Sequence, residues 1–195
     1  MESVILASSS PRRQEILKML GIPFQVIIPD VDESFSKTED IVKIPEILAV
    51  RKVRAVLASL AKRQVPWVLG ADTLICFNNK LYGKPTGPEE AFTFLSALQG
   101  NEHKVITSIA LYNGKTKQIV TSSDITKVAF RSMTDKEINW YISSGEWHGA
   151  AGGYRIQGLA SCFITHMDGL MSTVVGLPIS NLYAILTSQN YSFIE

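Results

Sequence analysis

The stretch VILASSSPRR, residues 4–13, decides the fold expected for this chain. Its apolar residues, Val4–Ala7, predict a short buried strand, and the three serines that follow predict a turn. Pro11 suits the first position of a helix, and Ser10 before it is typical of an N-cap. A buried strand, a tight turn and a helix in this order indicate an α/β architecture.

The rest of the chain continues this mixture of strands and helices. Further strands are predicted at residues 24–28, 67–77, 80–82, 105–112, 119–130, 154–165 and 171–175. Further helices are predicted from Pro45 to about Arg63, from Pro88 to Gly100, after the capping box of residues 134–137, and from Pro178. Because strands and helices do not alternate strictly, we expect a mixed sheet with helices packed on it, within one domain of residues 1–195.

Composition excludes several classes of protein. The chain has 195 residues, 46% of them hydrophobic, and 19 Lys+Arg against 18 Asp+Glu, so its net charge of +1 argues against a nucleic-acid binder. Two cysteines, Cys76 and Cys162, cannot build a disulfide framework, and we expect them to be buried free thiols in a reducing compartment. Apolar runs are too short for a signal peptide or a membrane span, so we expect a soluble cytoplasmic protein without membrane contact.

The start of the first helix is the first candidate site. Backbone N–H groups at a helix N-terminus attract anions, and Ser8, Arg12 and Arg13 would add further donors. Two arginines in a first turn oppose the helix dipole, which makes sense if an anion binds there. The alternative is an ordinary serine-capped helix with two exposed arginines.

The second candidate is Asp72, within the sequence GADT of residues 70–73 in an otherwise apolar strand. A carboxylate in such a strand is costly unless it is paired, hydrogen-bonded or bound to a metal. Gly70 and Ala71 are small, so we expect a ligand to approach the backbone there. The alternative is a strand end at which Asp72 caps a turn or faces solvent.

Three further features carry weaker signals. Asp30, Asp32 and Glu33 could bind Mg²⁺ or Mn²⁺, although acidic loops are usually only solvated. Lys84 is held between Gly83 and Pro85 and could contact phosphate, whereas a helical Lys52 is more often solvated. Gln157, in the glycine-flanked stretch of residues 151–158, could pair with a base edge or simply occupy a turn.

Taken together, these segments resemble the Maf family, the septum-formation-inhibitor homologues, which are nucleoside triphosphate pyrophosphatases. The resemblance rests on LASSSPRR at residues 6–13, GADT at 70–73, GKP at 83–85, GGYRIQG at 152–158 and VGLP at 175–178, in that order. It implies an elongated mixed α/β sheet like that of inosine triphosphatases, with two lobes around a cleft. It also implies a homodimer, a divalent metal (Mg²⁺ or Mn²⁺) and a nucleoside triphosphate as the small-molecule partner.

Three positions divide the family by substrate. Arg12, Thr73 and Gln157 match the type that acts on dTTP and UTP, whereas the 7-methyl-GTP type has Trp, Gln and Glu there. The resemblance therefore implies hydrolysis of dTTP and UTP to the monophosphate and pyrophosphate, with a possible link to arrest of cell division. The alternative is a nucleotide-binding regulator of septation that does not hydrolyse its ligand.

The resemblance also implies a role for each matching side chain. The triphosphate would bind residues that supply hydroxyl or cationic donors: Ser8, Arg13, Lys52 and Lys84. Glu33 and Asp72 would hold the metal, and Asp72 would act as the general base that takes a proton from water. Arg12, Thr73 and Gln157 would line the base pocket.

Overall fold

The structure is a computed structural model that describes residues 1–35, 40–61 and 63–193. Its strands are β1 (Val4–Ala7), β2 (Phe24–Val26), β3 (Trp67–Phe77), β4 (Lys80–Tyr82), β5 (Glu102–Asn113), β6 (Gln118–Phe130) and β7 (Ile164–Asp168). Its α-helices are α1 (Pro11–Met19), α2 (Ile44–Ser59), α3 (Pro88–Leu98), α4 (Asp135–Ser143), α5 (Met171–Val175) and α6 (Ile179–Ser188), and short 3₁₀ helices span Ala151–Gly153 and Leu159–Phe163. Among the described helices, none has the length and apolar character needed to cross a membrane.

The described strands form a mixed sheet, as the sequence predicted. Their order is β2-β1-β3-β5-β6-β7, with β4 paired to β3 outside this path. β1 runs parallel to both β2 and β3, whereas β4 and β7 pair antiparallel with β3 and β6. The chain divides into two compact units: unit 1 comprises residues 1–72, 107–124 and 176–195, and unit 2 comprises residues 73–106 and 125–175.

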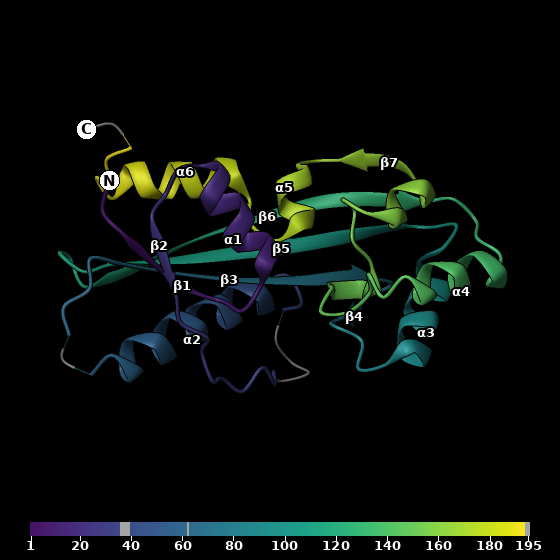
Figure 1. Ribbon diagram of the computed structural model, residues 1–195, viewed down its shortest axis with the longest axis horizontal. Coiled ribbons are helices and arrows are strands. Elements are labelled where there is room, and N and C mark those ends of the chain that lie inside the picture. The colour runs from purple at the N-terminus through teal and green to yellow at the C-terminus, as the bar shows by residue number, and fades with distance from the viewer. Residues whose placement is uncertain (36–39, 62, 194–195) are drawn as a thin grey trace. The chain divides into compact units, whose positions relative to one another are not determined.

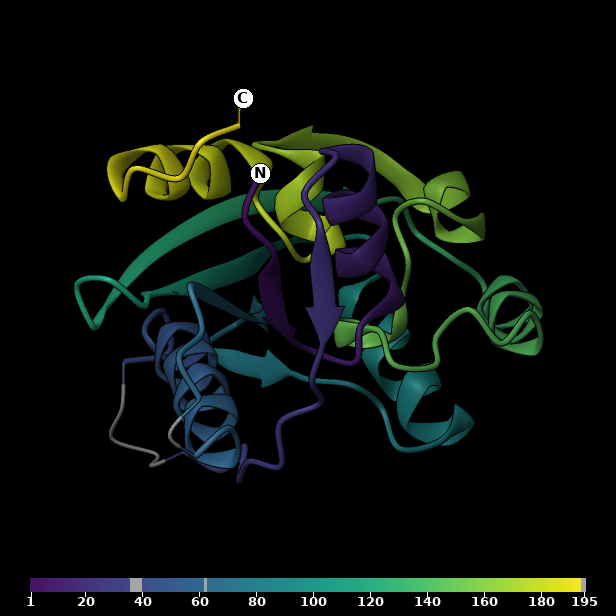
Figure 2. The same cartoon turned by 60° about the vertical axis from the view of Figure 1, so that its left-hand side comes forward.

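Unit 1 has helices on both faces of its part of the sheet. α1 and α6 cover one face and α2 covers the other, as two views agree (Figures 1 and 2). Small and β-branched residues of β1, α2 and β3 form the core beneath α2: Ile5, Ala7, Ala49, Val53, Val56 and Val68. In the register of β1 and β3, Ala7 lies opposite Gly70, so the chain leaves β1 toward Ser8 beside the stretch that carries Asp72.

Gly70 allows α2 to lie very close to β3. A Cβ at this position would be 2.6 Å from the carbonyl oxygen of Ala49 and 2.8 Å from a methyl group of Val53, both on α2. The glycine is therefore needed for close packing of helix on strand. We expected this small residue to admit a ligand; instead, the helix that carries Lys52 occupies the space.

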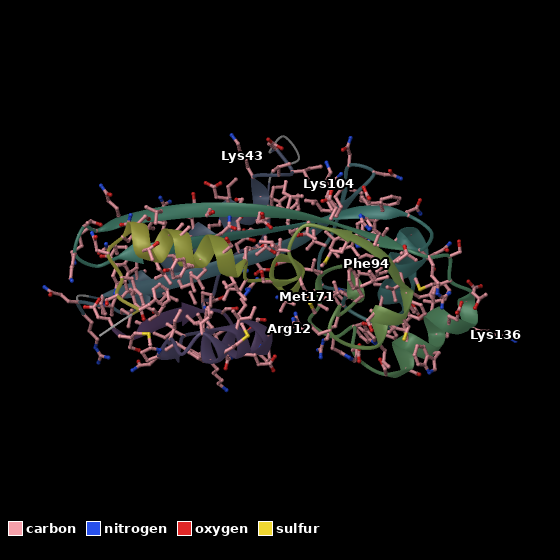
Figure 3. All side chains as sticks on the ribbon, turned by 90° about the horizontal axis from the view of Figure 1, so that it is seen from above. Arg12, Lys43, Phe94, Lys104, Lys136 and Met171 are labelled. Carbon is pink, nitrogen blue, oxygen red and sulfur yellow. The ribbon has the colours of Figure 1, made fainter. Side chains whose placement is uncertain are left out.

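Unit 2 packs α3 and α4 with their apolar sides in one core. Large side chains fill it, among them Leu95, Leu98, Tyr141 and Phe163. The capping box before α4 is present as predicted, with Thr134 and Glu137 exchanging hydrogen bonds. Phe94 on α3, labelled in Figure 3, meets the ring of Tyr82 edge-on.

Three predictions about unit 2 are wrong. The strand expected over residues 154–165 is a turn followed by a 3₁₀ helix, and β7 begins only at Ile164. The strand expected at residues 171–175 is helix α5. Cys162 is exposed and Cys76 half-buried, so the free thiols are not both buried.

Candidate active site

The turn between β1 and α1 joins Ser8 to Arg13. Ser8 Oγ accepts hydrogen bonds from Arg13 Nη1 at 3.0 Å and from the backbone N–H of Ser10 at 3.2 Å. Arg13 Nε donates to the carbonyl oxygen of Gly176 at 2.8 Å. Ser10 occupies the N-cap position, yet within the described part of the chain its side chain makes no cap hydrogen bond. A helix N-terminus carries a partial positive charge, so the start of α1 suits an anion.

Arg13 is buried, which excludes the alternative of two exposed arginines. Its exposed fraction is 8%. Burial lowers the pKa of its guanidinium to about 10, against the opposing effect of the Asp72 carboxylate. Arg13 stays protonated near neutral pH, so it contributes a fixed positive charge beside Ser8. Arg12 is half-buried at the start of α1 (Figure 3).

Lys52 bridges two carboxylates. Its Nζ lies 2.5 Å from Asp72 Oδ1 and 2.8 Å from Glu33 Oε1. The side chains of Lys52 and Asp72 are 8% and 9% exposed, whereas that of Glu33 is 51% exposed. A helical lysine that the sequence alone would place in solvent is therefore the buried centre of an ion-pair cluster. Arg13, Lys52, Glu33 and Asp72 bring two positive and two negative charges into one region of unit 1.

Asp72 keeps one oxygen for a further partner. Its Oδ2 is buried and, among the described residues, has no hydrogen-bond partner. Such an oxygen is costly in a protein interior unless a ligand, water or cation satisfies it. Because carboxylate oxygens suit Mg²⁺ and Mn²⁺, Asp72 and Glu33 fit the expected metal. Across the described residues, no group of three His, Cys, Asp or Glu side chains could hold a metal ion.

Arg51 fixes the loop that carries Glu33. Its Nη1 donates to the carbonyl oxygens of Asp32 at 3.2 Å and of Ser34 at 2.5 Å, the residues on either side of Glu33. The Asp32 carboxylate in turn accepts hydrogen bonds from the N–H and hydroxyl of Ser34, which lower the pKa of Asp32. The Asp32 carboxylate therefore stabilises the turn at Ser34, whereas the Glu33 carboxylate forms the ion pair with Lys52.

The remaining predicted residues belong to unit 2 or to its boundary. Thr73 follows Asp72 on β3 and is half-buried, Lys84 is exposed after β4, and Gln157 is exposed in the turn before the second 3₁₀ helix. Their roles stay predictions. Sequence reasoning missed Arg51, because the sequence gives no pattern that distinguishes it from a solvated side chain on a helix.

The fold and site define an α/β protein in which a serine-arginine helix start lies near a pair of carboxylates bridged by Lys52. The family model described as Maf, Maf-like protein, matches residues 3–189. The chain therefore belongs to the Maf family. That match spans both units.

Curated relatives that match this chain over nearly their whole length share the name dTTP/UTP pyrophosphatase. A dTTP/UTP pyrophosphatase of Desulforamulus reducens is 46% identical over 182 residues, covering 93% of this chain and 94% of the relative. Proteins of the same name from Clostridium botulinum and Pelotomaculum thermopropionicum are 41% and 38% identical, covering 95% and 98% of this chain and 96% and 99% of theirs.

Two solved structures are weakly similar. The Staphylococcus aureus Ham1 protein has a TM-score of 0.44 and 16% identity, covering 66% of this chain and 72% of that one. A nucleoside-triphosphatase / dITP/XTP pyrophosphatase of Mycobacterium abscessus has a TM-score of 0.43 and 11% identity, covering 96% and 95%. At these scores the likeness supports nothing further.

Proposed function

We propose that this chain is a nucleoside triphosphate pyrophosphatase that converts dTTP and UTP, with water, into the monophosphate and pyrophosphate. Water oxygen attacks the α-phosphorus, the bond from that phosphorus to the α–β bridging oxygen breaks, and pyrophosphate leaves with the electron pair of that bond. The proton lost by water passes to Asp72. The names of the full-length relatives support this substrate class.

The observation that carries the proposal is the buried Asp72 carboxylate: one oxygen is paired with Lys52, and the other has no hydrogen-bond partner within the part of the chain that the structure describes. Oδ1 is held by Lys52, which fixes the orientation of the carboxyl group. Oδ2 is left to accept a proton from a water molecule. A pure binding site for nucleotides would need cations and donors but no buried carboxylate prepared in this way.

The triphosphate would bind the donors of unit 1. The helix start and Ser8 offer hydroxyl and N–H donors, and Arg13 offers a guanidinium held by Gly176. An ammonium group has three donors. In the described part of the chain, Lys52 uses two of them on its carboxylates, so the third could bind a phosphate oxygen. Lys84 would add a further cation. Charge developing on the leaving pyrophosphate would thus meet positive groups that are already in place.

Glu33 and Asp72 would hold the divalent cation. Mg²⁺ commonly binds one or two carboxylates and takes its other ligands from substrate phosphates and water, so two acids suffice. When bound there, the cation supplies neutralisation of phosphate charge and makes water at the site more acidic. Mg²⁺ or Mn²⁺ at this position is part of the proposal.

On the family resemblance alone, we propose that Arg12, Thr73 and Gln157 recognise the base. The amide of Gln157 both donates and accepts hydrogen bonds, which matches the edge of uracil or thymine. We also propose, on the family resemblance alone, that the protein is a cytoplasmic homodimer; light scattering of the purified protein tests the dimer.

A substrate panel tests the proposal. Purified protein with Mg²⁺ is given dTTP, UTP, CTP, GTP and 7-methyl-GTP, and the products are separated and identified. We expect UMP and pyrophosphate from UTP, and faster turnover of dTTP and UTP than of the other nucleotides. Preference for 7-methyl-GTP would contradict the substrate assignment, and nucleotide binding without pyrophosphate release would support the non-hydrolysing regulator instead.

A further inference from the structure

Gln157 sits in a short turn of unit 2 whose backbone is tied at several points. The N–H of Arg155 donates to Tyr141 Oη at 3.0 Å, and the N–H of Gly158 donates to the carbonyl oxygen of Arg155 at 3.1 Å. The N–H of Leu159 donates to Glu146 Oε2 at 2.9 Å. The backbone around Gln157 is thus held on both sides, while the Gln157 side chain is exposed.

Glu146 lies directly against Gly158. A Cβ at position 158 would be 2.2 Å from Glu146 Oε2 and 2.5 Å from Oε1. The backbone of Gly158 has φ −116°, which other residues can adopt. A Cβ at position 158 would therefore displace the Glu146 carboxylate from its present position.

A carboxylate that accepts a backbone N–H makes a stronger hydrogen bond than a neutral acceptor does. Glu146 is half-buried, so solvent competes only in part for its oxygens. Its own N–H donates to Ser144 Oγ at 3.2 Å, which fixes the start of its side chain at the end of α4. The acid thereby connects a rigid helix end to the turn that presents Gln157.

We propose that Glu146 is a positioning residue for Gln157 and, through it, a determinant of selectivity for the pyrimidine base. This inference rests on the proposed function, because Gln157 matters only if it contacts the base. The Glu146 carboxylate holds Leu159 and occupies the space that a side chain at position 158 would take. The backbone of Gln157 is then held in one place, so less conformational freedom is lost when its amide meets the base edge.

The experiment compares Glu146→Ala, Glu146→Gln and Gly158→Ala with wild type. Calorimetry measures binding of UMP and of GMP, and steady-state kinetics measures kcat and KM for UTP and GTP. Glu146→Ala should weaken UMP binding and raise the KM for UTP by about tenfold, the effect expected for one charge-assisted hydrogen bond, with GMP binding unchanged. Glu146→Gln should stay close to wild type, because its amide oxygen also accepts the N–H of Leu159.

Gly158→Ala probes the same contact from the other side. The new methyl group meets the flexible end of Glu146, which can move, so we expect little change in melting temperature but the same loss of selectivity. In a Glu146→Ala background that methyl group has space, so the double variant should match Glu146→Ala alone. Glu102→Ala, an exposed glutamate on β5 in the same unit, is the control and should behave as wild type.

Unchanged selectivity for UMP over GMP in Glu146→Ala would overturn the proposal, as would an additive double variant. Monophosphate binding requires no turnover, so failure of hydrolysis and failure of positioning are seen separately. A wild type that binds UMP but releases no pyrophosphate from UTP contradicts the proposed reaction. Wild type that binds GMP as tightly as UMP contradicts the role of the Gln157 turn.

Discussion

Lys52 Nζ lies 2.5 Å from Asp72 Oδ1, inside unit 1, and the same ammonium group reaches Glu33 Oε1 at 2.8 Å. One buried cation thus serves two acids that come from a loop and from the middle of a strand. The pairing offsets the cost of burying the Asp72 carboxylate in an apolar strand, where a carboxyl group without a partner would be unfavourable. It also makes the two acids depend on a single side chain.

Replacement of Lys52 by methionine should damage stability and activity together. Methionine keeps the length of the side chain but leaves the Asp72 carboxylate buried without its cation. Breaking a buried pair from one side costs roughly 3–5 kcal/mol, so the midpoint of urea unfolding should fall clearly. Turnover of UTP should fall at least about a hundredfold, because a phosphate donor is lost as well.

Lys52→Arg is the matched variant, because it keeps the charge and changes the shape. It should recover most of the stability but only part of the activity, since a planar guanidinium does not place its donors as an ammonium does. Wild-type stability in Lys52→Met would contradict the description of this ion pair as buried and necessary.

Replacement of Asp72 by asparagine should separate binding from chemistry. The side chain keeps its size and loses its basic charge, so proton transfer from water fails. We expect kcat for UTP to fall about 10²–10⁴-fold. Nucleotide binding, measured by calorimetry in the presence of Ca²⁺, should change far less. If Asp72→Asn turns over UTP as fast as wild type, another group is the base.

The strands and the helix start that position the site could be predicted from the local sequence. β1 and β3 have the predicted bounds, because an apolar run flanked by turn residues leaves little choice of conformation. The turn and helix start after β1 follow from Pro11 in the same way. Local patterns could not predict the burial of charge. Lys52 is buried because Gly70 lets α2 lie close to β3, which carries Asp72, and Arg13 is held by Ser8 and Gly176.

The error over residues 154–163 has a cause that lies outside the local sequence. Spaced apolar residues suit a strand, but they suit a turn that packs on a core equally well. Residues 154–159 are held by side chains from distant positions, Tyr141 and Glu146, and such hydrogen bonds leave no periodic trace in the sequence. Glu146 and Arg51 went unnoticed for that reason, since each acts on backbone groups of another segment.

Arg51→Ala should weaken catalysis although it replaces none of the residues proposed to bind the substrate or the metal. Arg51 donates to the carbonyl oxygens on both sides of Glu33, so its removal loosens the loop that presents the acid. We expect kcat/KM for UTP to fall about tenfold, comparable to one hydrogen bond from a charged donor. A higher concentration of Mg²⁺ should be needed for half-maximal rate.

Arg54→Ala supplies the control for this effect. Arg54 lies one turn further along the same helix and is exposed. Arg54→Ala removes one positive charge from α2, as Arg51→Ala does, so any general electrostatic effect appears in both variants. Hydrogen–deuterium exchange over residues 31–35 should rise in Arg51→Ala and not in Arg54→Ala. Equal kinetics in the two variants would show that Arg51 acts only through its charge.

His103 should make unit 2 sensitive to acid. The ring is buried beside Phe130, its Nε2 lies 2.8 Å from Tyr154 Oη, and among the described residues its Nδ1 has no hydrogen-bond partner. Burial lowers the pKa of His103 from 6.5 to about 4. Between pH 6.5 and about 4, His103 is therefore protonated in the unfolded chain but neutral in the folded chain. The stabilising contribution of the neutral ring is complete above pH 6.5 and is lost as the pH falls toward 4.

Between pH 6.5 and 4, the decrease in the free energy of unfolding that His103 causes should approach roughly 3 kcal/mol. His103→Gln cannot take up a proton, so its free energy of unfolding should be lower at neutral pH yet flatter between pH 6.5 and 4. His166→Gln, which alters an exposed histidine on β7 of the same unit, should retain the full wild-type slope. Urea unfolding at a series of pH values measures all three proteins; a His103→Gln profile parallel to wild type would mean that the acid sensitivity arises from other groups.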